Sequence, residues 1–494
     1  MAKSVKTNYV LTLFDIVVGI AFPLVTLPYV TRILSPGSIG HVHFYLNILS
    51  YITLITSLGI PLYGVREIAK KSNNVKERNR SAIELFILHL LLTAIGYLVV
   101  FILGITVDKI KEDLFLFSLL SISMFFTTIG VSWFFQGVED FKYVTVRSLI
   151  VKLLSLVLLL SLVKNKDDVL WYGFVLICGS VGNNIFNFIR LNKYLTRDDF
   201  NKSLNPFRHI RPSSKVFVLN LTIGIYTQLS VFLLGFIQSD DAVGYYTMPQ
   251  RIVAVLNSVV LALTTVLLPK LSSYIGNNQQ KEFKTLGNKA LSFVLAISLP
   301  ICVALVILSR PIIMLLFGYQ YEKSITVLNI WAPILVAIGL SQIYGKSILY
   351  SKGHELLMTI STITGMVVFL IIAIPGVLYY SIIGASIASL MAEFSVTITM
   401  MYLGRKKHPC TMFRKENAAY VIACFIMAVP MIICTNYINN YFWQLCLGVI
   451  LGIITYMIVL DKMHDLLYFE IIDTIKRIWK NQEMALKSVL RQSL

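Results

Sequence analysis

The sequence predicts an all-α polytopic membrane protein with about 14 transmembrane helices. Hydrophobic residues make up 56% of the 494 residues and charged residues only 14%, which leaves too little polar surface for a soluble chain of this length. Apolar runs of roughly 20 residues, the length that spans a bilayer, recur along the whole chain. The basic residues gather in alternate loops between these runs, as they do in multi-pass membrane proteins.

The apolar runs give the boundaries of the predicted helices. The first helix ends before the turn Ser35–Ser38, and the segment 148–163 is the shortest of the set. The fourteen predicted spans are 9–34, 40–64, 81–104, 114–136, 148–163, 169–190, 216–238, 250–274, 289–309, 325–349, 356–375, 378–403, 418–437 and 442–460.

The positions of Lys and Arg predict that both termini are cytoplasmic. With the N-terminus inside, most of the 43 basic residues lie toward the inner face. The few on the outer side are Arg32, Lys109, Lys111, Lys164, Lys166, Arg251, Arg310 and Lys323. Topology therefore explains the net charge of +18, and the sequence gives no reason to expect nucleic acid as a partner.

The chain start and the cysteines favour the same class of protein. Lys3 and Lys6 precede an apolar run, as in a signal peptide, but no clean small-residue cleavage site follows. We therefore expect an uncleaved first helix. The six cysteines show no metal-ligand spacing, so neither a metal site nor a disulfide framework is expected.

A short internal repeat divides the chain into two lobes. The turn 35–41 (SPGSIGH) resembles 239–245 (SDDAVGY), and each precedes a long helix and then a basic loop. Two lobes of six helices with the same orientation are predicted, related by an axis along the membrane normal. The predicted division is an N-terminal lobe 1–190, a cytoplasmic loop 191–215, a C-terminal lobe 216–403, two further helices in 404–460 and an amphipathic cytoplasmic tail 461–494.

The candidate functional residues are ionisable side chains within or beside the spans. No phosphate-binding loop is present, and the outer loops are too short to hold a catalytic domain, so an enzyme is not expected. Charges in hydrocarbon are costly and usually face a cavity or a partner, although long side chains near span ends also reach the interface. The candidate bases are Arg32, Arg66, Arg251, Lys152 and Lys346, and the other candidates are Asp15, Glu393, Glu84 and His89.

Three stretches resemble the Wzx-type polysaccharide flippases of the multidrug/oligosaccharidyl-lipid/polysaccharide exporter superfamily. They are Thr26–Gly40 (TLPYVTRILSPGSIG) with Gly59–Glu67 (GIPLYGVRE), then Trp133–Lys142 (WFFQGVEDFK), and Leu316–Ser324 (LFGYQYEKS). With the spans, the resemblance covers essentially the whole chain. Ser38 and Ile39 depart from the acidic or Gly residue and Phe that are commoner in the family.

The resemblance implies a flippase for undecaprenyl-diphosphate-linked oligosaccharide repeat units. These would cross from the inner to the outer leaflet of the bacterial cytoplasmic membrane and be polymerised into O-antigen, capsule or exopolysaccharide. Expected partners are membrane lipids, the polymerase and the chain-length regulator. Relatives that flip the peptidoglycan precursor use arginines on helices one, two and eight, for which Arg32, Arg66 and Arg251 are the nearest counterparts by helix.

Arginine suits this substrate because its planar head donates several hydrogen bonds to phosphate. The sequence predicts no cofactor beyond a coupling H⁺ or Na⁺, for which Asp15, Glu393, Glu84 and His89 are candidates. The alternatives are a multidrug/cation antiporter of the same superfamily, which would want more acids in its cavity, and a membrane glycosyltransferase or polymerase. A scaffold without transport is a third.

Overall fold

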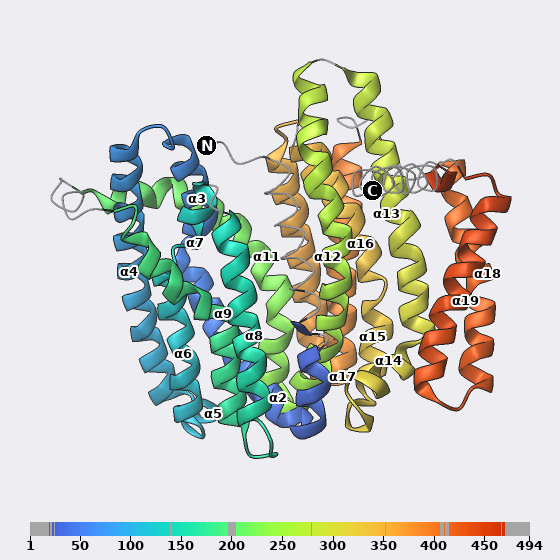
Figure 1. The fold of residues 1–494 in the computed structure, drawn as a ribbon, viewed down its shortest axis with the longest axis horizontal. Coiled ribbons are helices and arrows are strands. Elements are labelled where there is room, and N and C mark those ends of the chain that lie inside the picture. Colours follow the sequence, from blue (N-terminus) through green and yellow to red (C-terminus); the bar gives the residue numbers. More distant parts are fainter. Residues whose placement is uncertain are drawn as a thin grey trace, which may run out of the picture. The chain divides into compact units, whose positions relative to one another are not determined.

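The computed structural model describes residues 19, 22–23, 25–138, 141–195, 204–277, 279–350, 352–405, 410, 414–465 and 467–469. Within these ranges the chain is helical and contains no strand (Figure 1). This matches the predicted fold class. Asp15 and the tail beyond residue 469 lie outside the described residues, so their predicted roles stay predictions.

The N-terminal half consists of long helices joined by short turns. Residues 25–33 are helical and lead into the turn before α2. The elements that follow are α2 (Pro36–Ser57), α3 (Ile60–Lys70), α4 (Val75–Thr106), α5 (Asp108–Lys111), α6 (Leu114–Ile129), α7 (Ser132–Gly137), α8 (Phe141–Leu162) and α9 (Val169–Leu191).

The C-terminal half combines long helices with shorter ones and ends in a helix pair. Its elements are η1 (Pro206–His209), α11 (Ile210–Ile237), α12 (Asp240–Gly276), α13 (Gln280–Ile307), α14 (Ser309–Leu316), η2 (Tyr319–Tyr321), α15 (Ser324–Trp331), α16 (Ile334–Gln342), η3 (Ile343–Tyr350), α17 (Glu355–Gly404), η4 (Lys415–Asn417), α18 (Ala418–Tyr437) and α19 (Tyr441–Lys462).

The helices agree with the predicted spans in position and exceed several of them in length. Nine helices of the described residues are long and apolar enough to cross a membrane. One of them, α17, covers the two predicted spans 356–375 and 378–403. Ser381 (φ 49°, ψ −124°) interrupts its helical backbone, so α17 consists of two helices that meet at a kink. A count of fourteen spans is compatible with this structure.

Left-handed residues break two of the predicted spans. Leu58 and Gly59 both have positive φ and separate α2 from α3, although the sequence predicts one helix over 40–64. Val131 has φ 35° and separates α6 from α7 in the same way. Such a residue cannot continue a right-handed helix, so each span changes direction near its end.

The described residues form two compact units. One comprises Met1–Arg251, Leu316–Val327 and Thr362–Ala392, and the other comprises Ile252–Leu315, Leu328–Ser361 and Glu393–Leu494. The first unit therefore contains the start of α12 together with the helices that precede it. The predicted two-lobe division follows the chain order instead and stays a prediction.

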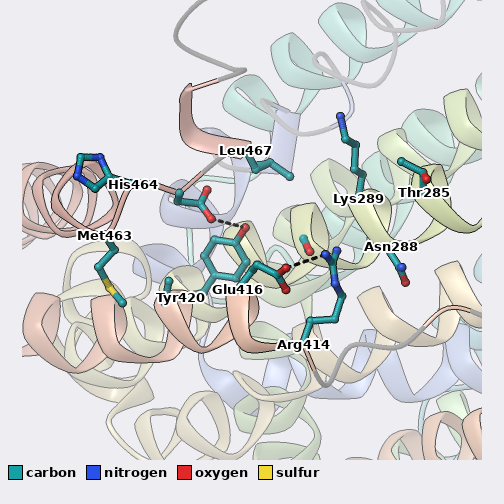
Figure 2. A pocket seen from close by; sticks show the side chains of 12 residues that line it. Thr285, Asn288, Lys289, Arg414, Glu416, Tyr420, Met463, His464 and Leu467 are labelled. Atoms are coloured by element: carbon teal, nitrogen blue, oxygen red, sulfur yellow. Dashed lines mark hydrogen bonds and ion pairs between the residues drawn. The ribbon is translucent and has the colours of Figure 1, made fainter.

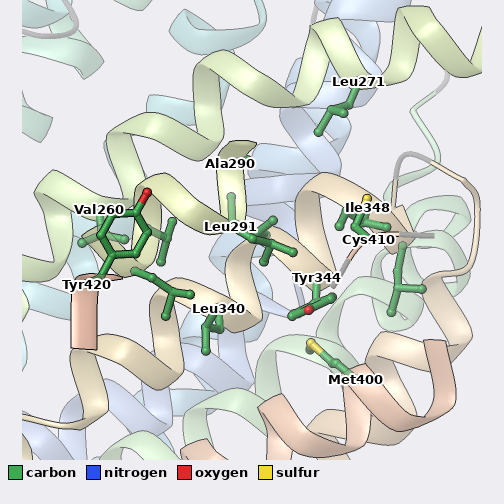
Figure 3. Close-up of a cluster of buried hydrophobic side chains, with 14 of the residues drawn as sticks. Val260, Leu271, Ala290, Leu291, Leu340, Tyr344, Ile348, Met400, Cys410 and Tyr420 are labelled. Carbon is green, nitrogen blue, oxygen red and sulfur yellow. The ribbon is translucent and has the colours of Figure 1, made fainter. Parts of the chain in front are cut away.

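The second unit is built around a buried apolar cluster. Leu291 of α13, Leu340 of α16, Tyr344 of η3 and Tyr420 of α18 are among its members (Figure 3). In Figure 1, α18 and α19 form an antiparallel pair within this unit. Gly452 allows the pair to approach closely, because a Cβ there would lie 2.9 Å from the sulfur of Met431.

Candidate functional site

Arg251 of α12 lies against the imidazole ring of His43 of α2. Its Nη2 is 3.3 Å from Nδ1 and 3.2 Å from Nε2 of His43, so the guanidinium faces the ring rather than one of its nitrogens. Arg251 is half-buried, and His43 is buried. Among the described residues Arg251 has no carboxylate partner. A half-buried cation without a counter-ion is costly in a membrane protein unless an anion or water reaches it.

Tyr172 of α9 also contacts His43. Its hydroxyl lies 3.3 Å from Nε2 of His43, and the two rings meet edge to face. Tyr172 is buried. The two neighbours of the imidazole, Arg251 and Tyr172, come from different helices. The cluster of Arg251, His43 and Tyr172, here called the arginine cluster, can orient a cationic guanidinium toward an anionic group such as a phosphate.

The other candidate bases lie on helical segments other than α12. Arg66 is exposed on α3 and has no hydrogen-bond or ion-pair partner among the described residues. Arg32 is exposed at the end of the first helical segment. Lys152 of α8 is half-buried, and its Nζ lies 3.8 Å from where a Cβ on Gly19 would stand. Lys346 lies in η3. Their predicted contacts with substrate stay predictions.

Glu84 of α4 is fully buried and surrounded by donors. Asn205 donates its backbone N–H to Oε1 at 2.9 Å, and Arg80 donates its Nε–H to the same oxygen at 3.1 Å. His209 lies 3.0 Å from Oε2, and Arg208 forms an ion pair with that oxygen. The carboxylate therefore anchors the end of the 191–215 loop to α4, whatever its part in ion coupling.

The ring of His209 is satisfied in its neutral form. Nε2–H can donate to Glu84, while Nδ1 accepts from the hydroxyl of Tyr63 at 2.9 Å. Burial lowers the pKa of His209 below its ordinary value, and the hydrogen bond to Glu84 offsets this only in part. His209 is thus a neutral linker between α3 and α4 at neutral pH.

Two other candidates are buried within helices. Among the described residues, neither ring nitrogen of His89 on α4 has a hydrogen-bond partner. Glu393 of α17 is 9% exposed, and its carboxylate has no hydrogen-bond or ion-pair partner in the part of the chain that the structure describes. Thr397 donates its hydroxyl to the backbone carbonyl of Glu393 at 2.9 Å. Buried, unpartnered groups of this kind are candidates for proton or ion binding, and that role stays a prediction.

The two repeated turns pack against each other within the first unit. A Cβ on Gly40 would lie 1.8 Å from the carbonyl oxygen of Asp240 and 2.7 Å from the backbone nitrogen of Gly244. A Cβ on Gly244 would lie 2.1 Å from the carbonyl oxygen of Pro36. Residues 36 and 40 occupy the repeat positions of 240 and 244, so the contact is reciprocal. Only glycine permits this approach of two helix starts.

Charged side chains flank the contact between the starts of α2 and α12. Oδ2 of Asp240 lies 2.8 Å from Nδ1 of His41, and Oδ1 of Asp240 lies 2.6 Å from Nζ of Lys109. The Nε2 of His41 also lies 3.7 Å from Asp113, which caps α6. Lys109 covers the ring of Phe44 at 4.5 Å. These contacts tie α2, α5, α6 and α12 together at one end of the unit.

The stretch Leu316–Ser324 closes over the same region. Gln320 donates to the backbone carbonyls of Thr31 and Leu34, within the four residues that precede the first repeated turn. Ser324 donates its hydroxyl to the carbonyl of Tyr245 at 2.8 Å, in the second turn. The Leu316–Ser324 stretch therefore links both repeats.

The stretches Gly59–Glu67 and Trp133–Lys142 also meet in space. A Cβ on Gly64 would lie 2.8 Å from the indole of Trp133, and a Cβ on Gly137 would lie 2.8 Å from Ile68. Phe134 is fully buried in the same cluster. Two motifs that are about seventy residues apart thus form one packed block of α3 and α7.

A family model described as polysaccharide biosynthesis protein matches residues 5–275, more than half of the chain. The chain belongs to this family. A putative O-antigen transporter of Shigella dysenteriae is 26% identical over 77% of this chain and 95% of its own length. A probable low-salt glycan biosynthesis flippase, Agl15 of Haloferax volcanii, is 21% identical over 57% of this chain and 59% of its own length.

Solved structures establish the relation of the fold to transporters. The lipid II flippase MurJ in an inward closed conformation superposes with a TM-score of 0.74 at 16% identity, covering 93% of this chain and 98% of MurJ. An inward-facing MATE multidrug transporter of the MOP superfamily gives 0.63 at 17% identity, covering 82% and 95%. The family and the named relatives indicate a multi-pass transporter rather than an enzyme, as the sequence predicts.

Several residues of these clusters were not predicted from sequence. His43 lies in the predicted span 40–64 and Tyr172 in the predicted span 169–190, but nothing in the sequence pairs either residue with Arg251. His41 and Asp240 lie in the repeated turns, and comparison of the two turns was a signal that could have found them. Lys109 was assigned only to the outer side and not to a partner.

Proposed function

We propose that this protein is a flippase that carries undecaprenyl-diphosphate-linked oligosaccharide units from the inner to the outer leaflet. The structural observation behind the proposal is Arg251, a half-buried cation on a long helix, held by neutral His43 and without a carboxylate partner among the described residues. A diphosphate needs such a group, because it cannot cross hydrocarbon without compensation of its charge. The names of the O-antigen transporter and flippase relatives support the same class of substrate.

In this mechanism the diphosphate contacts Arg251 while the lipid tail stays in the membrane. Neutral His43 and Tyr172 orient the guanidinium without neutralising it, so the charge remains for the substrate. Arg32 and Arg66 are the further proposed diphosphate contacts, with Lys152 and Lys346 as additional bases. Alternating access, driven by an ion gradient or the membrane potential, would expose the site to each leaflet in turn.

Neutralising the arginines tests the proposal. We expect Arg251→Ala to lower polymer export about tenfold or more, because a charged hydrogen-bonding group is lost, and Arg251→Lys to restore part of it. The triple variant, in which Arg32, Arg66 and Arg251 are all changed to Ala, should export no polymer although the amount of protein in the membrane is normal. Normal polymer output from the triple variant would contradict the proposal. Lys462→Gln, an exposed change at the end of α19, is the control.

The proposed location is the bacterial cytoplasmic membrane, with both termini inside and with the polymerase and chain-length regulator as functional partners. The excess of basic residues in alternate loops supports this orientation. A topology reporter fused after Leu494 should give the signal of a cytoplasmic location. An external signal would overturn the fourteen-span arrangement.

A cation or drug antiporter is the second candidate, favoured by one observation. Glu393 is a buried carboxylate without a partner among the described residues, as an antiporter site requires. Export of a fluorescent organic cation that is lost in Glu393→Gln, together with unchanged polymer output, would support the antiporter over the flippase.

A further inference from the structure

The second unit contains a cavity of about 470 Å³ that the proposed transport mechanism does not use. Its walls come from the first half of α13, from the segment that leads into α18 and from the chain just after α19 (Figure 2). The volume lies within the range of roughly 300–1,000 Å³ that small-ligand pockets occupy. A molecule the size of a lipid headgroup therefore fits.

The cavity lies where helices leave the apolar layer. The span α18 begins at Ala418, beside the cavity, and α19 ends at Lys462, directly before its last wall. Both helices are long and apolar enough to cross a membrane. The loops around this end are rich in Lys and Arg, which predicts the inner face. Phospholipid headgroups reside at this depth.

The cavity presents charges of both signs from separate elements. Lys289 comes from α13, while Arg414 and Glu416 come from the segment before α18. Arg414 Nη2 pairs with Glu416 Oε1 at 2.9 Å, as the dashed line in Figure 2 shows. Their side chains are 33% and 54% exposed, so the pair contributes little to stability and can exchange partners with a ligand.

The floor of the cavity is fixed by a buried carboxylate. Asp465 accepts the hydroxyl of Tyr420 at 3.1 Å and the backbone N–H of Tyr468 at 2.8 Å. The chain reaches this position through His464, which has φ 53°. A non-glycine residue in the left-handed region is strained, and such strain gathers at binding sites. Asp465 is therefore held in place, and Glu416 is the carboxylate left to meet a ligand.

The opening carries apolar side chains. Met463 lines the cavity and is exposed, and Phe469 lies exposed just after the cavity wall with its ring stacked on His464. Exposed apolar groups beside a charged pocket suit a ligand with a polar head and an apolar body, since basic pockets between transmembrane helices bind lipid headgroups.

We propose that this cavity binds the headgroup of a phospholipid that carries both a phosphate and a primary ammonium group. The phosphate contacts Arg414 and Lys289, and the ammonium contacts Glu416. The glycerol and the first carbons of the acyl chains pack on Met463. A phosphate without an ammonium would leave Glu416 unmatched, and a quaternary ammonium could not donate hydrogen bonds to it.

Native mass spectrometry of the purified full-length protein tests the proposal. The probes are phosphatidylethanolamine, phosphatidylglycerol and phosphatidylcholine with identical acyl chains, and soluble phosphoethanolamine and inorganic phosphate as competitors. We expect phosphatidylethanolamine to bind most tightly. Arg414→Gln should weaken binding of phosphatidylethanolamine and phosphatidylglycerol about tenfold, since each loses a charged contact with phosphate.

The remaining variants separate the two charges and exclude a general effect. Glu416→Gln should reduce binding of phosphatidylethanolamine to the level of phosphatidylglycerol and leave phosphatidylglycerol unchanged. Lys462→Gln, which removes a nearby exposed charge outside the cavity, should change neither. Hydrogen exchange in residues 414–420 should slow on addition of phosphatidylethanolamine.

Three results would overturn the proposal. The first is equal phosphatidylethanolamine binding by Arg414→Gln and Lys462→Gln. The second is phosphatidylcholine that binds as tightly as phosphatidylethanolamine. The third is soluble phosphoethanolamine or phosphate that displaces the lipid at the lipid's own concentration, which would assign the cavity to a soluble ligand. Polymer export does not enter these readouts, so their failure is separate from a failure of the proposed flippase.

Discussion

Gly40 and Gly244 hold the starts of α2 and α12 together by a reciprocal contact. A Cβ on Gly40 would lie 1.8 Å from the carbonyl oxygen of Asp240, and a Cβ on Gly244 would lie 2.1 Å from that of Pro36. We expect Gly40→Ala and Gly244→Ala each to lower the melting temperature of the purified protein and to reduce export. Backbone atoms cannot yield to a methyl group as a flexible side chain can.

Gly179→Ala is the matched control for Gly40→Ala and Gly244→Ala. A Cβ there would meet only the side chain of Ser155, at 3.3 Å. The control should keep its melting temperature close to that of the wild type. If Gly40→Ala melts at the same temperature as Gly179→Ala, the reciprocal contact is not needed for stability.

The ion pair of Lys109 and Asp240 should couple α5 to α12. The Nζ and Oδ1 atoms are 2.6 Å apart, and both side chains are 25% exposed. A double-mutant cycle with Lys109→Gln and Asp240→Asn should give a coupling energy of ~1 kcal/mol, weakened by salt, because the pair is partly solvated. Chemical unfolding of the four proteins in detergent provides the measurement. Additive effects of the two changes would show that the pair does not couple these helices.

Glu393→Gln and Asp15→Asn test ion coupling. Glu393 has no partner for its carboxylate among the described residues, and we predict that it binds a transported cation or proton. We expect Glu393→Gln to make transport of lipid-linked substrate into vesicles less dependent on an imposed gradient, while the protein level stays constant. Glu322→Gln, an exposed change in the loop after η2, serves as the control. Gradient dependence that is unchanged in both Glu393→Gln and Asp15→Asn would remove these acids from the mechanism.

His209 should make stability depend on pH. Burial lowers the pKa of His209 in the folded protein, so the folded state binds fewer protons than the unfolded state around pH 6.5. The stabilisation is present above pH 6.5 and is lost as pH falls through the lowered pKa. Between pH 7 and pH 5 the melting temperature of the wild type should therefore fall further than that of His209→Gln, whose amide does not titrate. Parallel curves for the two proteins would contradict this account.

Hydropathy and charge were sufficient to predict the helices, because a membrane-spanning helix needs only length and apolar side chains. They placed α18 at its observed bounds and α19 within two residues of its observed bounds. They could not predict the breaks at Leu58 and Val131, since both residues are apolar and look like helix interior. Such breaks depend on tertiary packing, which composition does not encode.

The sequence predicted only part of the candidate site, because contacts between helices also depend on tertiary packing. A charged residue in an apolar run stands out, and Arg251 was found in this way. Its neighbours His43 and Tyr172 come from other helices and are neutral, so only the folded chain brings them together. Glu84 stood out equally, but its donors Asn205 and His209 lie more than a hundred residues away.

The packed block of α3 and α7 constrains how this sequence can change over evolutionary time. Gly64 faces Trp133, and Gly137 faces Ile68, each with room for hydrogen alone. A larger residue at 64 is compatible only with a smaller one at 133, and the same exchange holds for 137 and 68. Homologous sequences should therefore vary at these positions in pairs, and chimaeras that join one protein's α3 to another's α7 should fail where the pairs are mismatched.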